Sequence, residues 1–154
     1  MSSVSIQAVS RTFEGHKGQR TQALLPVDFE VRDNDFVTIL GPSGCGKSTL
    51  LRIVAGLDHA TSGRVLLDGV PVEGPGADRG MVFQSYTLFP WLTIEQNIRF
   101  GLRERGMPEA QQKERAAYFI AKVGLRGFEQ HFPKQLSGGM QQRTAIARAL
   151  ANDP

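Results

Sequence analysis

Residues 41–49 read Gly-Pro-Ser-Gly-Cys-Gly-Lys-Ser-Thr, and this stretch decides the fold class. It satisfies the phosphate-loop pattern G-x-x-x-x-G-K-S/T, in which two glycines, a lysine and a hydroxyl stand at fixed spacing. The apolar run 36–40 before it predicts a buried strand, and the apolar residues within 48–57 recur as on one helix face. A strand, a glycine-rich turn and a helix in this order predict an α/β fold of the P-loop type.

The chemistry of this turn predicts that it binds a phosphate group. Backbone N–H groups converge there, and the following helix N-terminus adds partial positive charge. Lys47 would reach the terminal phosphates of a nucleotide, and the Ser48 hydroxyl would ligate Mg²⁺. The alternative is a glycine-rich turn that binds nothing, but this would not explain why every position of the pattern is filled between a strand and a helix. The predicted binding positions are Gly41, Pro42, Ser43, Gly44, Cys45, Gly46, Lys47, Ser48 and Thr49.

Composition excludes several classes of protein. The chain has 154 residues, 40% hydrophobic and 21% charged, as in one ordinary soluble domain. Its net charge is +3, but Lys and Arg are scattered among acidic residues, which argues against a nucleic-acid partner. Cys45 is the single cysteine and agrees with a reducing compartment. No apolar run reaches the roughly 18 residues of a membrane span, and no signal peptide is evident, so we expect a cytoplasmic chain.

Periodicity predicts further elements on both sides of the loop. Strands are expected at 4–13, 25–32, 64–67 and 81–83, the second alternating as in a half-exposed antiparallel strand. After residue 92 the chain reads as helical.

Three helices are expected in this later part. Thr93-Ile94-Glu95-Gln96 has capping-box spacing and would start one towards residue 105. Pro108 suits the first turn of a second helix, with Gly124 as its stop. A third helix would begin at 137–139 and run to about residue 151.

The start of that last helix forms a second motif, Leu-Ser-Gly-Gly-Met at 136–140, followed by Gln-Gln-Arg. Ser137 is a good N-cap, and Gly138 and Gly139 leave the helix N-terminus bare of side chains. This predicts a second anion site without a lysine of its own. The alternative is a capped helix start whose glycines are accidental.

The phosphate loop, then Val82-Phe83-Gln84, then residues 136–140, in this order, strongly resemble the ATP-binding subunit of ABC transporters. The resemblance runs over essentially the whole chain. The amino-acid sequence of residues 76–84 and 86–93 is similar to that of the nitrate, sulfonate and taurine import class. Met140 stands where most of the superfamily has Gln, and this import class often carries Met there.

The resemblance implies an α/β P-loop ATPase of the ABC type. It would have an N-terminal antiparallel β part, a parallel core sheet and an inserted helical subdomain. Residues 1–154 would form one incomplete domain, divided into an ATP-binding core (1–84), a helical subdomain (85–140) and a signature helix (141–154).

The resemblance also implies roles for single residues. ATP and Mg²⁺ would be the cofactors, with Lys47 and Gln84 catalytic and Ser48 and Gln84 ligating the metal. Phe13 would stack on adenine in place of the family's more usual Tyr. Ser137, Gly138 and Gly139 would bind the γ-phosphate of ATP held by a second, head-to-tail copy. The alternatives are a polar residue at a strand end for Gln84 and ordinary core packing for Phe13.

The implied function is ATP hydrolysis that powers solute import from the cytoplasmic face of the cell membrane. Residues 86–91 would lie near the groove that receives a helix of the membrane permease, although an apolar cluster under a loop explains them nearly as well. A solute-binding protein would take part indirectly, and no nucleic acid would.

In this family a strand ending in Asp-Glu and a later histidine complete the site. The chain stops at Pro154, before that strand, and its histidines (His16, His59 and His131) all precede residue 136. We therefore expect an N-terminal fragment that hydrolyses little ATP alone. Two alternatives remain open at this point, namely a small-metabolite P-loop kinase and a soluble ABC-type ATPase acting on nucleic acid or ribosomes.

Overall fold

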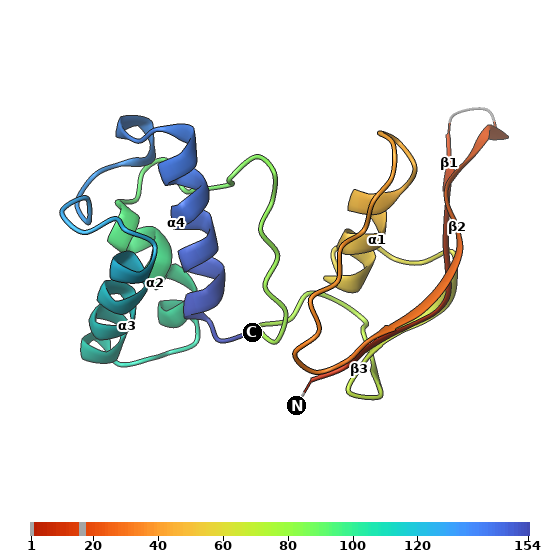
Figure 1. Ribbon diagram of the computed structural model, residues 1–154, viewed down its shortest axis with the longest axis horizontal. Helices are drawn as coiled ribbons and strands as arrows, with labels where there is room; N and C mark the ends of the chain where they lie inside the picture. Colours follow the sequence, from red (N-terminus) through yellow and green to blue (C-terminus); the bar gives the residue numbers. More distant parts are fainter. Residues whose placement is uncertain (1, 16–17) are drawn as a thin grey trace. The chain divides into compact units, whose positions relative to one another are not determined.

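The computed structural model describes residues 2–15 and 18–154. The chain forms two compact units, Met1–Gly76 and Ala77–Pro154 (Figure 1). His16 lies outside the described residues.

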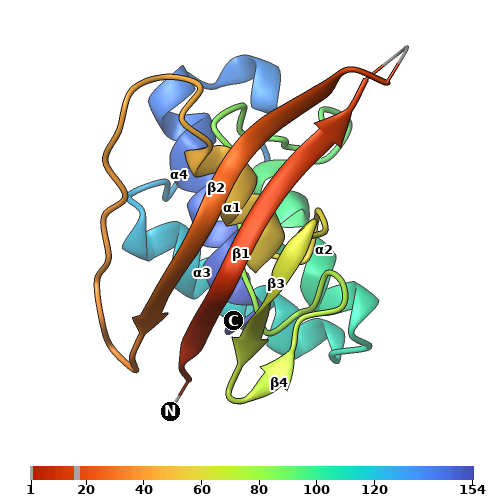
Figure 2. The same ribbon diagram turned by 90° about the vertical axis from the view of Figure 1, so that its right-hand side faces the viewer.

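The first unit is built on a four-stranded antiparallel sheet. Its strands are β1 (Val4–Glu14), β2 (Arg20–Val31), β3 (Ser62–Leu67) and β4 (Val70–Pro71). Their order in the sheet is β2-β1-β3-β4, and each neighbouring pair is antiparallel (Figure 2). The strands predicted at 4–13, 25–32 and 64–67 are therefore confirmed, and the second begins five residues earlier than expected.

Helix α1 (Lys47–Val54) lies behind this sheet in Figure 2. Leu50 and Ile53 of α1 pack into the core of the unit, because they lie on one face of the helix. The remaining buried residues of that core come from the sheet strands and are Ile6, Val9, Leu24 and Val65. The helix ends three residues before the predicted position 57, and Leu57 is 45% exposed.

Two strand predictions were wrong. Residues 36–40 and 81–83 are irregular, and Phe36 and Leu40 are 95% and 87% exposed. A parallel strand is stable only when neighbouring strands satisfy its backbone N–H and C=O groups. Among the described residues every strand pair is antiparallel, and neither segment is paired in the sheet. The expected parallel core sheet is consequently not formed by this part of the chain.

The second unit contains three α-helices and a 3₁₀ turn. They are α2 (Ile94–Glu104), α3 (Glu109–Lys122), η2 (Pro133–Gln135) and α4 (Gly138–Ala151). All three α-helices pack on one another around a common apolar core. The fully or almost fully buried side chains at its centre are Ile94, Ile98, Leu102, Ile120 and Leu125. The helices predicted after residue 92 are therefore confirmed, and α4 ends at the predicted residue.

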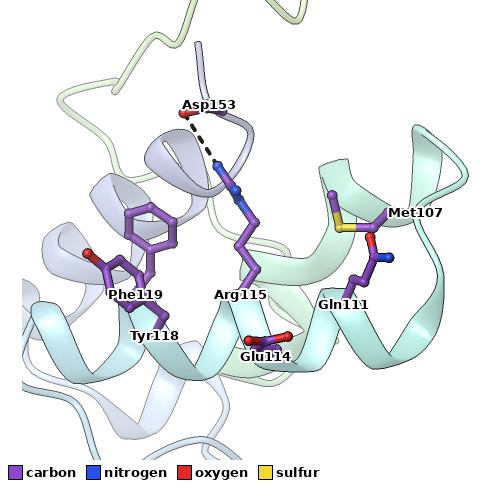
Figure 3. Close-up of a pocket in the computed structure, with 7 residues that line it drawn as sticks. All are labelled: Met107, Gln111, Glu114, Arg115, Tyr118, Phe119 and Asp153. Atoms are coloured by element: carbon purple, nitrogen blue, oxygen red, sulfur yellow. Dashed lines mark ion pairs between the residues drawn. The ribbon is translucent and has the colours of Figure 1, made fainter.

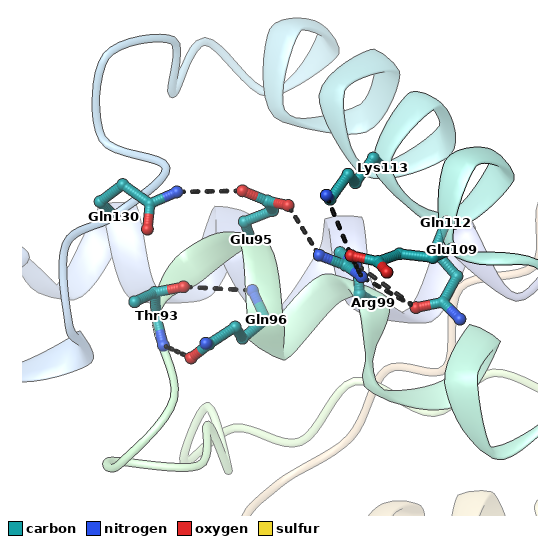
Figure 4. A network of polar contacts seen from close by, with 8 residues as sticks. All are labelled: Thr93, Glu95, Gln96, Arg99, Glu109, Gln112, Lys113 and Gln130. Atoms are coloured by element: carbon teal, nitrogen blue, oxygen red, sulfur yellow. Dashed lines mark hydrogen bonds and ion pairs between the residues drawn. The ribbon is translucent and has the colours of Figure 1, made fainter.

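Local capping explains where α2 begins. The Thr93 hydroxyl accepts from the Gln96 N–H at 3.2 Å, and the Gln96 side-chain oxygen accepts from the Thr93 N–H at 2.9 Å (Figure 4). This reciprocal pair is the predicted capping box. Arg99 then joins α2 to α3, with ion-pair distances of 3.0 Å to Glu95 and 3.5 Å to Glu109.

No helix within the described residues has both the length and the apolar character needed to cross a membrane.

Candidate nucleotide-binding site

The phosphate loop has the backbone that its glycines predict. Gly44 and Gly46 adopt φ of +82° and +84°, which side chains other than glycine rarely tolerate. A Cβ at Gly46 would also fall 2.1 Å from the carbonyl oxygen of Ala23 in β2. Gly46 thus lets the loop pass against the sheet, and it is the N-cap residue of α1.

Helix α1 starts without a side-chain cap and without an acidic residue in its first turn. The N–H groups of Lys47, Ser48 and Thr49 have no acceptor within the helix, because the first turn lacks preceding carbonyls. The start of α4 likewise has no acidic residue, whereas the first turns of α2 and α3 contain Glu95 and Glu109. At α1 and α4 no carboxylate of the first turn therefore competes with an incoming anion.

Lys47 crosses the loop that precedes it. Its ammonium donates to the carbonyl oxygens of Gly41 at 2.9 Å and Pro42 at 3.0 Å. The Sγ atom of the exposed Cys45 lies 3.9 Å from the same nitrogen. A lysine ammonium has three donors, and all three are directed at the loop, which places the positive charge there.

A metal at this site would depend on hydroxyl and phosphate oxygens. Among the described residues, no group of three or more His, Cys, Asp or Glu side chains could hold a metal ion. The exposed Ser48 hydroxyl has the hard oxygen that Mg²⁺ prefers, and Mg²⁺ commonly binds through few protein ligands plus substrate phosphates. The donor set therefore fits a magnesium–nucleotide complex.

Phe13 lies near the end of β1 and is 41% exposed, outside the buried core of the first unit. The Arg11 guanidinium covers one face of the ring, 4.5 Å from its centroid. Arg11 is itself held by Asp58 at 2.7 Å. The ring is thus supported on one side by a fixed cation, an arrangement that the sequence analysis did not identify.

The second motif forms the start of α4 as predicted. The Ser137 hydroxyl accepts from the Met140 N–H at 3.3 Å, and Gly138 and Gly139 form the first exposed turn. A Cβ at Gly138 would lie 3.0 Å from the Tyr86 hydroxyl, whereas nothing lies within 4 Å of one at Gly139. The helix start is therefore bare at Gly139 and bordered by Tyr86 at Gly138.

Gln84 is exposed at a bend, and its side chain makes no hydrogen bond to any described residue. The chain then passes through Tyr86 and Thr87, whose φ values of 21° and 49° are unusual for non-glycine residues. Gln84 lies in the second unit with residues 137–139, whereas the phosphate loop and Phe13 lie in the first.

The predicted permease-contact segment is partly anchored and partly exposed. Trp91 is 70% exposed and contacts Phe89, whose ring in turn contacts Phe100 at a centroid distance of 4.5 Å. The buried Asn97 donates to the carbonyls of Phe89, Leu92 and Thr93 at 3.0–3.1 Å and accepts from the Phe89 N–H at 2.9 Å. Sequence reasoning missed Asn97, although a polar residue on the apolar face of α2 was a usable signal.

A cavity of about 550 Å³ lies along α3 (Figure 3). Arg115 crosses it towards Asp153 at 3.5 Å and lies 5.7 Å from the Phe119 ring centroid. None of its lining residues is a predicted site residue. They are Met107, Gln111, Glu114, Arg115, Tyr118, Phe119 and Asp153.

Comparison with known proteins agrees with this geometry. Residues 24–154 match the ABC transporter family. The chain is 57% identical over 151 residues to an uncharacterised ABC transporter ATP-binding protein of Methanocaldococcus jannaschii, covering 98% of this chain and 56% of that relative. It is 48% identical to the nitrate import ATP-binding protein of Synechocystis sp., with the same two coverages. It is 49% identical to the taurine import ATP-binding protein of Burkholderia pseudomallei, covering 100% of this chain and 59% of that relative.

The chain thus spans little more than half the length of these relatives. A solved dimeric ATP-binding cassette in a post-hydrolysis state, bound to ADP and phosphate, matches with a TM-score of 0.89 and 36% identity. That match covers 98% of this chain and 70% of the solved one. The predicted ABC-type fold class and the resemblance to the nitrate and taurine import class are confirmed, and the chain belongs to the ABC transporter family.

Proposed function

We propose that this chain is the nucleotide-binding part of an ATP-hydrolysing subunit that drives solute import through a membrane permease. The observation that carries the proposal is the complete phosphate loop, with Lys47 held across it and an uncapped helix start behind it. Its relatives' names favour an importer over the small-metabolite kinase and over an ATPase acting on nucleic acid.

ATP–Mg²⁺ is the ligand in this proposal. The N–H groups at the start of α1 bind the phosphates, because they lack acceptors and carry the positive end of the helix dipole. Lys47 exchanges its carbonyl contacts for the terminal phosphates, and Ser48 ligates the metal. Phe13, supported by Arg11 from one side, offers its other face to adenine. The bound metal supplies charge neutralisation at the transferring phosphoryl group.

A second copy of the chain completes each site. Ser137, Gly138 and Gly139 form a helix start that accepts an anion, yet the chain already has its own phosphate loop. Two phosphate-binding helix starts for one nucleotide are explained if two copies pack head to tail, each supplying residues 137–139 to the other's ATP. The dimeric state of the solved relative supports this arrangement.

Gln84 links hydrolysis to transport in the proposed subunit. Its exposed side chain would help ligate Mg²⁺ and orient the attacking water, as the family resemblance implies. The exposed Trp91 and the aromatic residues beneath it form the proposed contact with the permease.

The subunit would sit on the cytoplasmic face of the membrane and serve a solute of the nitrate, sulfonate or taurine kind, delivered by a binding protein. Residues 1–154 would form one nucleotide-binding domain with three parts, the ATP-binding core (1–84), the helical subdomain (85–140) and the signature helix (141–154).

The test is nucleotide titration of the full-length subunit carrying Lys47→Ala. Charge-assisted hydrogen bonds contribute about 1.5–3 kcal/mol each, so we expect ATP affinity to fall at least tenfold, since about 1.4 kcal/mol is a factor of ten. Lys113→Ala is the matched control, because this exposed lysine is ion-paired with Glu109 on α3, far along the chain from residues 41–49. Equal affinities for parent and Lys47→Ala would reject the assignment.

A further inference from the structure

Arg148, in the last turn of α4, holds a segment some 60 residues earlier in the chain. One guanidinium nitrogen donates to the Thr87 carbonyl at 2.8 Å. The other donates to the Thr87 hydroxyl at 3.1 Å and to the Tyr86 carbonyl at 3.5 Å. The guanidinium also lies over the Phe89 ring, 5.5 Å from its centroid. A single side chain therefore contacts three residues of the segment 86–89, namely Tyr86, Thr87 and Phe89.

The segment needs such support. Tyr86 and Thr87 both have positive φ, a conformation that non-glycine residues adopt only when their surroundings impose it. The two carbonyl groups that accept from Arg148 belong to these same residues. Burial lowers the pKa of Arg148, but an arginine stays charged at every physiological pH. Its contacts are thus charge-assisted and only partly screened by water.

The segment is also bound by α2 and lies beside the start of α4. At the start of α4, the Tyr86 hydroxyl borders Gly138. On α2, Asn97 fixes both the N–H and the carbonyl of Phe89. Gln84 stands only two residues before Tyr86. Tyr86 therefore lies beside the first turn of α4 at Gly138, and Arg148 binds the chain just after Gln84 to the last turn of that helix.

We propose that Arg148 is a positioning residue that makes Gln84 and the helix start at 137–139 move as one body. The inference rests on the proposed function and deepens it, because both groups would act on the phosphates of ATP. Phosphoryl transfer depends on positioning, and a misplacement of about 1 Å can cost about a hundredfold in rate. Lysine cannot replace Arg148 fully, since only the planar guanidinium reaches two carbonyls, a hydroxyl and a ring together.

The experiment compares Arg148→Ala and Arg148→Lys in the full-length subunit. Arg105→Ala is the control, because its guanidinium also donates to a carbonyl near the end of α4, that of Asn152 at 2.6 Å, without touching residues 86–89. Hydrogen exchange of residues 85–91, kcat and the KM for ATP are measured for each variant.

We expect faster exchange in residues 85–91 and a kcat about tenfold to a hundredfold lower in Arg148→Ala. The KM should stay within about twofold, because ATP is bound by residues 41–49. Arg148→Lys should lie between the parent and Arg148→Ala, and Arg105→Ala should resemble the parent in all three measurements. If Arg148→Ala does not fold, Arg148→Lys and Thr87→Ala carry the same comparison.

Three outcomes would overturn the inference. Unchanged exchange in residues 85–91 would show that Arg148 does not hold the segment. Faster exchange with an unchanged kcat would show that the contact has no role in catalysis. A kcat loss equal to that of Arg105→Ala would assign the effect to general stability of α4. If the parent itself hydrolyses no ATP, the proposed function fails first, and this result is distinguishable because the parent alone reveals it.

Discussion

Single residues in this chain are constrained by contacts that their sequence neighbours do not reveal. Gly44 and Gly46 have nearly the same positive φ, but only Gly46 faces the backbone of β2 at a distance that excludes a Cβ. Asn97 is fully buried and uses both ends of its amide to fix the loop before α2. The cost of a substitution therefore depends on what the side chain meets in three dimensions.

Gly46→Ala should be more damaging than Gly44→Ala. Both substitutions carry the cost of about 1–2 kcal/mol for a left-handed residue with a side chain. Gly46→Ala adds a clash with the Ala23 carbonyl, whereas a Cβ at Gly44 meets nothing within 4 Å. Urea unfolding of the full-length protein measures the difference, and equal midpoints for the two variants would contradict the expectation.

Asn97→Ala should lower the free energy of unfolding by about 2–4 kcal/mol, because it leaves a buried N–H and several carbonyls without partners. Gln96→Ala is the control, since it loses only a capping contact at an exposed position and should cost about 1 kcal/mol. Thermal or urea unfolding gives both values. Similar losses for the two variants would show that the Asn97 amide is not essential to the loop.

At the scale of elements, polar contacts fix where the helices begin and how they join. The pKa of Glu109, in the first turn of α3, is lowered mainly by a hydrogen bond from Lys113 and further by the charges of Lys113 and Arg99. The pKa of Glu129, in the loop before α4, is lowered by hydrogen bonds from backbone N–H groups, its own first and that of Gly127 next. Both carboxylates are more favourable charged in the folded state than in the unfolded one.

This predicts a direction for the pH dependence of stability. A carboxylate whose folded pKa lies below its unfolded value of 4.5 contributes stability above that pH and loses it as the pH falls through the folded pKa. The free energy of unfolding should therefore decline below about pH 4.5. Glu129→Gln should flatten that decline while leaving a lower plateau at pH 7, as measured by urea unfolding across pH 3–7. An unchanged slope would refute the role of Glu129.

At the scale of the whole molecule, the proposed function needs two copies of the chain. In that proposal, the start of α4 binds a phosphate group only when a second copy places its own nucleotide against residues 137–139. Gly139 is the better position for a test than Gly138, because a side chain at Gly138 would also disturb Tyr86.

Gly139→Asp in the full-length subunit should prevent dimerisation induced by a non-hydrolysable ATP analogue, since it puts a negative charge where the phosphates must approach. Affinity of the single subunit for the analogue should be unchanged. Gly139→Asn has nearly the same shape without the charge and should impair dimerisation less. Analytical ultracentrifugation measures the dimer, and a Gly139→Asp protein that dimerises like its parent would rule out the shared site.

Residues 1–154 alone are expected to hydrolyse ATP far more slowly than the full-length subunit. Within their sequence no Asp-Glu pair follows an apolar strand, so no such carboxylate is available to orient the attacking water. Phosphate release measured for both proteins tests this. Comparable rates would mean that another residue in this chain serves as the catalytic base.

The sequence by itself determined the features that depend on local chemistry. The glycines of the phosphate loop, the Thr93–Gln96 capping box and the Ser137 cap each act within a few residues, so their helices begin where the pattern predicts. Only the tertiary structure decided the rest. The segment 36–40 is as apolar as a buried strand, yet it is irregular and mostly exposed, because a strand exists only when a partner satisfies its backbone. Arg148 and Thr87 lie about 60 residues apart, and no periodicity in the sequence indicates that the fold joins them.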